Sequence, residues 1–186
     1  YASENCGAKL GQFVQSISFF NEKAYIVVNG ANKIVIVDAR TFEYIDTIGG
    51  LGFPRYFYPI DDKTACVTQW GVDGLSGSIA VVNLTTRKVI QKTPLPQPEK
   101  MYQADPSTLL VANIGGYGLD STISYIDIKS GGELKRRKFR GAPLGFAALN
   151  NKIYVLGKGG YGPAPDYTPY PGWLAAVDGP ESYELL

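Results

Sequence analysis

The sequence contains no histidine. Histidine is the side chain whose ordinary pKa lies nearest to neutral pH, and it is the commonest metal ligand in proteins. Without it, these 186 residues cannot form an imidazole general base, a Ser-His-Asp triad or a His-ligated metal centre. Most readily recognised hydrolytic chemistry is therefore excluded for this chain.

An excess of one charge and long apolar runs are also missing. The 18 Lys and Arg residues balance 17 Asp and Glu residues, which gives a formal net charge of +1. Such a chain has no overall field that favours nucleic acid or an anionic membrane. No run reaches the roughly 18 apolar residues of a membrane span. We therefore predict neither nucleic-acid binding nor a transmembrane span, and we expect the basic run "ELKRRKFR" at 133–140 to form an exposed edge strand.

Cysteine is scarce and methionine almost absent, with two Cys and one Met. Cys66 lies in the apolar run "TACVTQW", so we expect a buried free thiol that packs as a small hydrophobic group. A bridge between Cys6 and Cys66 is the alternative. The chain opens with Tyr1 and without a signal peptide, and we expect its start to be processed or truncated.

Glycine, proline and tyrosine are abundant instead, with 22 Gly, 12 Pro and 13 Tyr. This composition is typical of a protein with many turns and with aromatic residues on its strands. Hydrophobic residues make up 45% of the chain, which is enough for a substantial core.

A repeat of about 45 residues runs through the sequence. Similar segments end at Asp38, Asn83, Asp127 and Asp178: "KIVIVD", "SIAVVN", "TISYID" and "WLAAVD". Other short apolar runs precede and follow each segment, and turns rich in Asn, Asp, Gly and Pro separate them. Each repeat therefore predicts four antiparallel strands in the order a, b, c, d.

Four strands in each repeat are typical of the blade of a β-propeller. We predict an all-β fold with about four four-stranded blades, which together form a single propeller domain, or a fragment of one, over residues 1–186. The repeats span about 14–49, 54–95, 98–140 and 143–186. A solenoid or a β-sandwich is the alternative, but a sandwich does not explain why strand c keeps its ending. We expect four blades to be part of a longer ring, with a four-bladed or dimeric ring as the alternative.

The connections between strands b and c lengthen along the chain, from 29–32 through 70–77 and 114–121 to 157–172. The motif "GGYG" opens two of them, at 115–118 and 159–162. In a meander, the b–c and d–a connections lie at the same end of the sheet, so this end is predicted to carry the ligand-binding residues. The b–c candidates are Trp70, Tyr117, Tyr161, Tyr167, Tyr170, Asp73, Asp120 and Asp166, and the d–a candidates are Arg55 and Lys100.

Each candidate also has a structural interpretation. The tyrosines and Trp70 suit stacking on a flat ligand or a sugar, or packing against a neighbouring blade. Arg55 and Lys100 could hold a ligand carboxylate or phosphate, or pair with an acidic residue of the next blade. The aspartates could bind Ca²⁺, but they lack the spacing of known calcium loops, so no metal site is predicted.

Several longer segments carry a resemblance to a known family: "GQFVQSISFFNEKAYIVVNGANKIVIVDARTFEYIDTI", "PRYFYPIDDKTACVTQW", "GSIAVVNLTTRKVI", "QPEKMYQ" and "LLVANIGGYGLDSTISYIDI". Over residues 10–180 the chain resembles the YVTN/YncE-like seven-bladed propellers. It is most similar to the Bacteroidota branch of cell-surface lipoproteins, which includes a cobalamin-binding propeller that caps an outer-membrane transporter.

The resemblance implies a seven-bladed ring that is exported to the cell surface, outer membrane or periplasm. It also implies binding at the end with the long loops, with cobalamin or a related corrinoid as ligand and an outer-membrane transporter as partner. A glycan is the alternative to a corrinoid as the ligand. We therefore expect a binding protein that is not an enzyme and has no cofactor. The alternatives are a propeller enzyme (a lyase or an oxidoreductase) and a purely structural assembly subunit.

Overall fold

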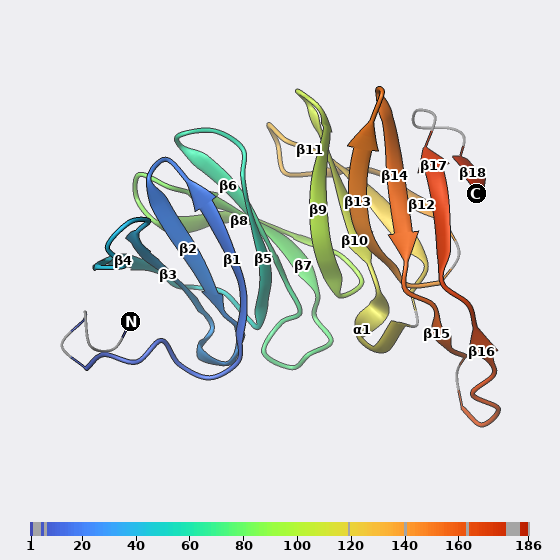
Figure 1. The fold of residues 1–186 in the computed structure, drawn as a ribbon, viewed down its shortest axis with the longest axis horizontal. Coiled ribbons are helices and arrows are strands. Elements are labelled where there is room, and N and C mark those ends of the chain that lie inside the picture. Colours follow the sequence, from blue (N-terminus) through green and yellow to red (C-terminus); the bar gives the residue numbers. More distant parts are fainter. Residues whose placement is uncertain are drawn as a thin grey trace. The chain divides into compact units, whose positions relative to one another are not determined.

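The computed structural model describes residues 1, 5, 7–118, 120–139, 141–162, 164–177 and 183–185. Within these residues lie four sheets of four strands each and one two-stranded hairpin. The chain divides into two compact units, Tyr1–Pro94 and Leu95–Leu186, and each unit holds two of the four-stranded sheets (Figure 1).

The first unit contains sheets 1 and 2. Sheet 1 consists of β1 (Val14–Phe20), β2 (Lys23–Val28), β3 (Lys33–Asp38) and β4 (Tyr44–Ile48), with the short 3-10 helix η1 (Asn29–Ala31) between β2 and β3. Sheet 2 consists of β5 (Pro54–Pro59), β6 (Thr64–Gln69), β7 (Ser78–Asn83) and β8 (Lys88–Pro94). In both sheets the hydrogen-bonded order follows the chain, so each is an antiparallel meander.

The second unit contains sheets 3 and 4, which are also antiparallel meanders. Sheet 3 consists of β9 (Pro98–Asp105), β10 (Thr108–Asn113), β11 (Thr122–Asp127) and β12 (Glu133–Lys138), with the short helix α1 (Gly115–Gly118) between β10 and β11. Sheet 4 consists of β13 (Pro143–Leu149), β14 (Lys152–Gly157), β17 (Trp173–Val177) and β18 (Tyr183–Leu185). The hairpin of β15 (Gly160–Tyr161) and β16 (Pro169–Tyr170) is inserted between β14 and β17. The predicted all-β class of four-stranded blades is confirmed.

The repeated ending of strand c has a physical cause in the turn that follows it. Asp38 Oδ1 accepts hydrogen bonds from the backbone N–H groups of Arg40 and Thr41, each at 2.8 Å. Asn83 and Asp127 accept in the same way from Thr86 and Ser130, at 2.8 and 2.7 Å. Such side chains replace the backbone partners that a tight turn lacks. The Asp/Asn repeat therefore marks the c–d turn of sheets 1, 2 and 3. Asp178, the fourth member of the repeat, lies outside the described residues.

The middle strands and the edge strands differ in burial, as their sequences predict. In β2 and β7 five consecutive residues are buried, because both faces of the strand are covered. Along β12 the side chains alternate between partly buried and exposed. This strand, which contains most of the basic run 133–140, lies at the edge of sheet 3, as predicted.

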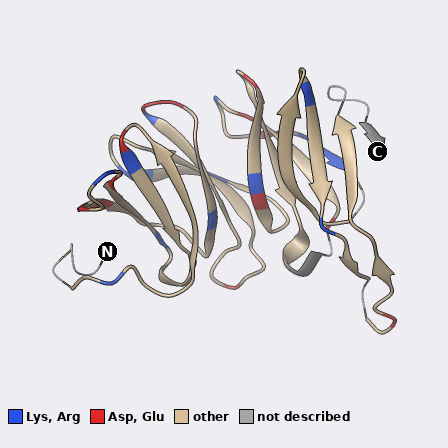
Figure 2. Cartoon of the chain, viewed as in Figure 1, with Lys and Arg blue, Asp and Glu red and all other residues tan. Residues whose placement is uncertain are grey.

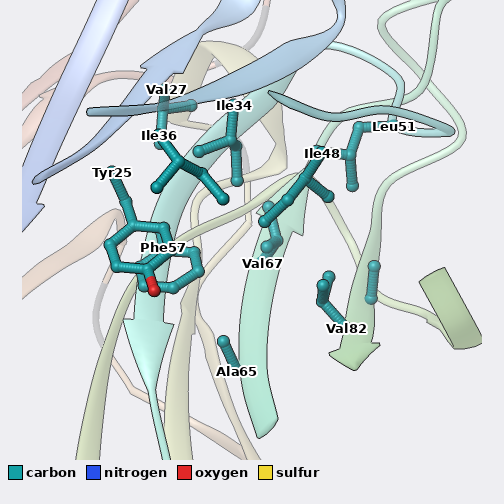
Figure 3. Packing of buried hydrophobic residues seen from close by; sticks show 11 residues of the cluster. Tyr25, Val27, Ile34, Ile36, Ile48, Leu51, Phe57, Ala65, Val67 and Val82 are labelled. Atoms are coloured by element: carbon teal, nitrogen blue, oxygen red, sulfur yellow. The ribbon is translucent and has the colours of Figure 1, made fainter. Parts of the chain in front are cut away.

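The core of the first unit lies between sheets 1 and 2. The rings of Tyr25 and Phe57 stack with their centroids 4.2 Å apart and their planes at 9° (Figure 3). Ser16 and Ser18 on β1 donate from Oγ to the carbonyl oxygens of Arg55 and Phe57, at 2.8 and 3.0 Å. Apolar packing and hydrogen bonds thus join the two sheets.

The core of the second unit lies between sheets 3 and 4. Phe139 stacks on Trp173 with a centroid distance of 6.0 Å, and Tyr102 stacks on Phe146 at 6.2 Å. Leu110, Ile123, Tyr125, Val155, Ala175 and Val177 complete the buried cluster.

Cys66 is a buried free thiol, as expected. Burial raises the pKa of its thiol to about 12, because a thiolate is poorly solvated there. Cys6 lies outside the described residues.

Candidate functional site

Every strand a begins with a β-bulge at the end of the sheet that carries the b–c loops. The pairing with strand b shifts between Val14 and Ser16, Pro54 and Tyr56, Pro98 and Met101, and Pro143 and Gly145. A bulge redirects the side chain of the extra residue and is frequent beside binding sites. The residues at these bulges are Gln15, Arg55, Glu99 with Lys100, and Leu144. Among them, only Arg55 and Lys100 were predicted from the sequence as ligand-binding residues.

In the first unit, the bulge residue Arg55 contacts both Gln15, the bulge residue of β1, and Trp70 from the b–c loop of sheet 2. Arg55 Nη1 donates to Gln15 Oε1 at 2.8 Å, and the guanidinium carbon lies 4.2 Å from the centre of the Trp70 ring. A guanidinium at this distance from an indole makes a cation–π contact. The Trp70 Nε1 donor is buried, and no described residue accepts its hydrogen bond. We call these three residues the indole–guanidinium cluster.

Asp73 structures its own loop. Its Oδ1 accepts from the N–H groups of Leu75 and Ser76, at 2.9 and 2.8 Å, and its Oδ2 accepts from Ser76 Oγ. These donors, led by the Ser76 hydroxyl, lower the pKa of Asp73 to about 2. Val72 and Leu75 are the exposed large hydrophobic residues of this loop, and neither was among the candidates predicted from the sequence.

Asp120 has a similar structural role in the second unit. Its Oδ1 accepts from Thr122 N and Thr122 Oγ1, at 2.7 and 2.5 Å. Asn113, at the end of β10, is fully buried and donates from Nδ2 to Thr122 Oγ1 and Ser124 Oγ. Both side chains therefore hold the 114–121 loop against sheet 3.

The 157–172 loop forms the β15–β16 hairpin. Tyr161 and Tyr167 are 66% and 59% exposed on it. Tyr170 instead packs against Gly141. A Cβ atom added to Gly141 would lie 2.7 Å from the Tyr170 ring. The only charged residue between 159 and 172 is Asp166, which is exposed near the tip, and the rest of the hairpin is drawn without charge in Figure 2. The hairpin therefore offers two exposed phenol rings.

The two "GGYG" segments lie at the same end of sheets 3 and 4 (Figure 1). The first forms α1 and the second contains β15, with positive φ angles at Gly115, Gly116 and Gly159. The side chain of Tyr117 lies outside the described residues. On β9 at this end, Lys100 is exposed and Glu99 is 1% exposed, so a buried carboxylate precedes the exposed ammonium.

The structure thus brings Arg55 and Trp70 together and exposes Tyr161 and Tyr167. It turns Asp73 and Asp120 towards their own loops and Tyr170 towards Gly141. Within the described ranges, no three Cys, Asp or Glu residues lie close enough together to hold a metal ion. None of the helices in these ranges has the length and hydrophobicity that crossing a membrane requires.

Comparison with solved structures shows which fold the four-stranded sheets belong to. Hydrazine synthase from Kuenenia stuttgartiensis superposes with a TM-score of 0.67 at 15% identity, over 88% of this chain and 50% of that chain. For a quinoprotein alcohol dehydrogenase-like protein from Bacteroides thetaiotaomicron, the TM-score is 0.65 at 15% identity, over 100% of this chain and 44% of that one. For BamB from Moraxella catarrhalis, it is 0.55 at 17% identity, over 85% and 43%.

At these identities the likeness shows the fold alone, which is that of β-propeller blades. The chain spans half or less of the length of these structures. Residues 1–122 match the model of the Domain of unknown function family DUF5074, and the chain belongs to this family. A search of curated protein sequences finds no match.

Proposed function

We propose that this protein is a non-catalytic binding protein of the cell surface, in which the loop-bearing end of the propeller binds a small ligand. The indole–guanidinium cluster is the observation that carries this proposal. A flat indole under a cation, with an N–H that lacks an acceptor, suits a flat ligand that bears polar substituents. Cobalamin or a related corrinoid is the first ligand to test, on the basis of the family resemblance. A glycan is the second.

The exposed faces of the sheets support membership in a larger ring, which the resemblance implies to be seven-bladed. Ile17 occupies in sheet 1 the position of Phe57 in sheet 2, but Ile17 is 46% exposed and Phe57 is 3% exposed. Leu156 and Leu174 of sheet 4 occupy the positions of Val27 and Ile34 in sheet 1, and they are exposed where the latter are buried. Further blades would cover these apolar side chains.

Ligand titration with fluorescence detection tests the binding function. Cyanocobalamin and neutral oligosaccharides are titrated while the emission of Trp70 and Trp173 is followed, with calorimetry as the second measurement. We expect Trp70→Ala to weaken binding about tenfold, which is about 1.4 kcal/mol. Tyr161→Ala measures the part played by the hairpin.

Tyr44→Ala is the matched control, because Tyr44 is an exposed tyrosine beside the c–d turn, at the opposite end of sheet 1. Equal affinities in the wild type and in Trp70→Ala would remove the indole–guanidinium cluster from the site. An equal loss in Tyr44→Ala would show that the effect is not specific to the loops.

A second candidate function is docking on an outer-membrane transporter. The observation that favours it is the pair of exposed apolar side chains, Val72 and Leu75, in the same loop as Trp70. Exposed apolar side chains at a loop tip suit a protein contact better than a polar small ligand. The double variant Val72→Ser/Leu75→Ser should abolish co-purification with a transporter partner and leave ligand affinity unchanged. Unchanged co-purification would contradict docking through this loop.

A further inference from the structure

A cavity of about 340 Å³ lies in the second unit, between sheets 3 and 4. It opens among the a–b turns and strand β12, at the end opposite the long loops, so it is separate from the indole–guanidinium cluster. Its volume is in the range of small-molecule sites. The lining residues that carry the argument are Leu110, Tyr125, Lys135, Ile153, Val177 and Asp105.

Tyr125 supplies a buried donor at this cavity. The residue is 6% exposed, and no described residue forms a hydrogen bond with its hydroxyl. A buried hydroxyl without a partner costs free energy that a bound acceptor recovers. The cavity therefore holds one polar group that a ligand would satisfy.

Lys135 places a positive charge over the ring of Tyr125. It pairs with Tyr125 across β11 and β12, and its ammonium nitrogen lies 4.9 Å from the centre of the Tyr125 ring. Leu110, Ile153 and Val177 form apolar walls. A donor, a cation and apolar walls together fit an apolar molecule with an anionic group.

The acidic residue of the lining lies on the exposed rim. Asp105 Oδ1 accepts from Ser107 N and Ser107 Oγ, both at 2.7 Å, and these bonds lower the pKa of the Asp105 carboxyl. Asp105 thus stays ionised, but solvent screens its charge from a ligand bound below it.

The equivalent groove of the first unit shows which positions create the cavity. Leu110 stands where sheet 1 has Tyr25, whose ring fills the space by stacking on Phe57. Lys135 stands where sheet 1 has Asp46, which forms an ion pair with Arg87 at the groove. The groove of the first unit measures about 220 Å³.

We propose that the cavity between sheets 3 and 4 binds a small apolar carboxylate of about the size of phenylacetate. Its carboxylate accepts hydrogen bonds from Tyr125 Oη and Lys135 Nζ, and its apolar body contacts Leu110, Ile153 and Val177. This site is independent of whatever the long loops bind.

The test is calorimetric titration of the full chain with phenylacetate and with neutral phenylacetamide. We expect phenylacetate to bind at least tenfold more tightly than the amide. Tyr125→Phe and Lys135→Gln should each weaken phenylacetate about tenfold. Leu110→Phe, which fills the cavity, should abolish binding. The matched controls are Tyr25→Phe and Arg87→Gln at the groove of the first unit, and neither should change the affinity.

Phenylalanine, which adds an ammonium group to the same skeleton, tests the influence of Asp105. If phenylalanine binds and phenylacetate does not, the proposal is wrong, because the site would then recognise a zwitterion. Equal affinities for the acid and the amide, or no effect of Tyr125→Phe, also overturn it. Melting curves show whether each variant folds. Lys135→Gln changes only a partly exposed strand residue, so it keeps the test valid if a buried substitution unfolds the chain.

Discussion

Both units pack two meander sheets together, yet they fill the space between the sheets differently. The first unit stacks Tyr25 on Phe57 and sets an Arg87–Asp46 ion pair beside the groove. The second unit has Leu110 and Lys135 at the corresponding positions and leaves a cavity of about 340 Å³ under an unpartnered hydroxyl. The difference shows that the strand pattern sets the scaffold, while a few side chains between the sheets decide how large a cavity remains, about 220 Å³ in the first unit and about 340 Å³ in the second.

The largest effect on the free energy of unfolding is expected from removing the stacked contact between Tyr25 and Phe57 in the first unit. Phe57→Ala should lower the free energy of unfolding by about 3–5 kcal/mol, because the ring is buried and stacked. Phe146→Ala, at the corresponding position of the second unit, should cost about half as much, because Phe146 is only partly buried. Urea unfolding followed by circular dichroism measures both. Equal losses would mean that the two interiors are packed equally well.

The second largest effect on stability is expected from replacing a glycine of the second unit. A Cβ at Gly157 would lie 2.0 Å from Trp173, so Gly157→Ala should destabilise by about 1–3 kcal/mol. The corresponding positions Val28 and Gln69 in the first unit carry side chains without such a clash. Trp173 emission should change with the loss of the 2.8 Å hydrogen bond from its Nε1 to Gly141 O. Gly145→Ala is the control, since its Cβ would meet only Leu156 at 3.8 Å.

The unpartnered hydroxyl should give a smaller effect of opposite sign. Without ligand, Tyr125→Phe should raise the free energy of unfolding by about 1 kcal/mol, because it removes a buried group that lacks a hydrogen bond. Tyr25→Phe in the first unit should bring no gain, because its hydroxyl is not among the buried unpartnered groups. The same urea experiment compares the two variants. An equal gain in both would remove the distinction between the two grooves.

The smallest effect concerns two turns, one in each unit, in which an aspartate accepts hydrogen bonds from a serine three residues later. Asp73 has a folded pKa of about 2, below the roughly 3.9 of an unfolded aspartate. Its contribution to stability is therefore present above about pH 4 and is lost as the pH falls towards 2. Ser76→Ala should raise the Asp73 pKa towards its ordinary value, and Ser130→Ala should do the same for Asp127 in the second unit. Carboxyl titration by NMR measures both, and an unchanged pKa in either variant would contradict the hydroxyl as the main cause.

Much of the fold follows from local patterns. The segments "VQSISFF", "KIVIVD", "SIAVVN" and "TISYID" coincide with β1, β3, β7 and β11. Strand periodicity and turn chemistry depend on near neighbours in sequence, so a sequence can reveal them. The chain's membership in a single propeller domain stays a prediction, as do the binding roles of the loop residues.

The candidate site was harder to predict than the strands. Loop position selected Tyr161 and Tyr167, which are exposed, and also Asp73, Asp120 and Tyr170, which contact their own loops or Gly141. The ligand-binding role of all five residues stays a prediction. Gln15 was missed because only the bulge in β1 and the hydrogen bond from Arg55 show that it belongs to the indole–guanidinium cluster. The hydrogen bond between Gln15 and Arg55 joins residues 40 positions apart, so no local sequence pattern predicts it.

The sequence by itself determined the repeat of four strands, the Asp and Asn endings of strand c, and the end of each sheet at which the long loops lie. These features depend on residues a few positions apart. Only the tertiary structure decided which polar side chains turn inward, that the Trp70 ring lies against the Arg55 guanidinium, and that Tyr125 faces a cavity. The reason is that a side chain's partner and the free space around it come from distant strands that meet only when the sheets pack.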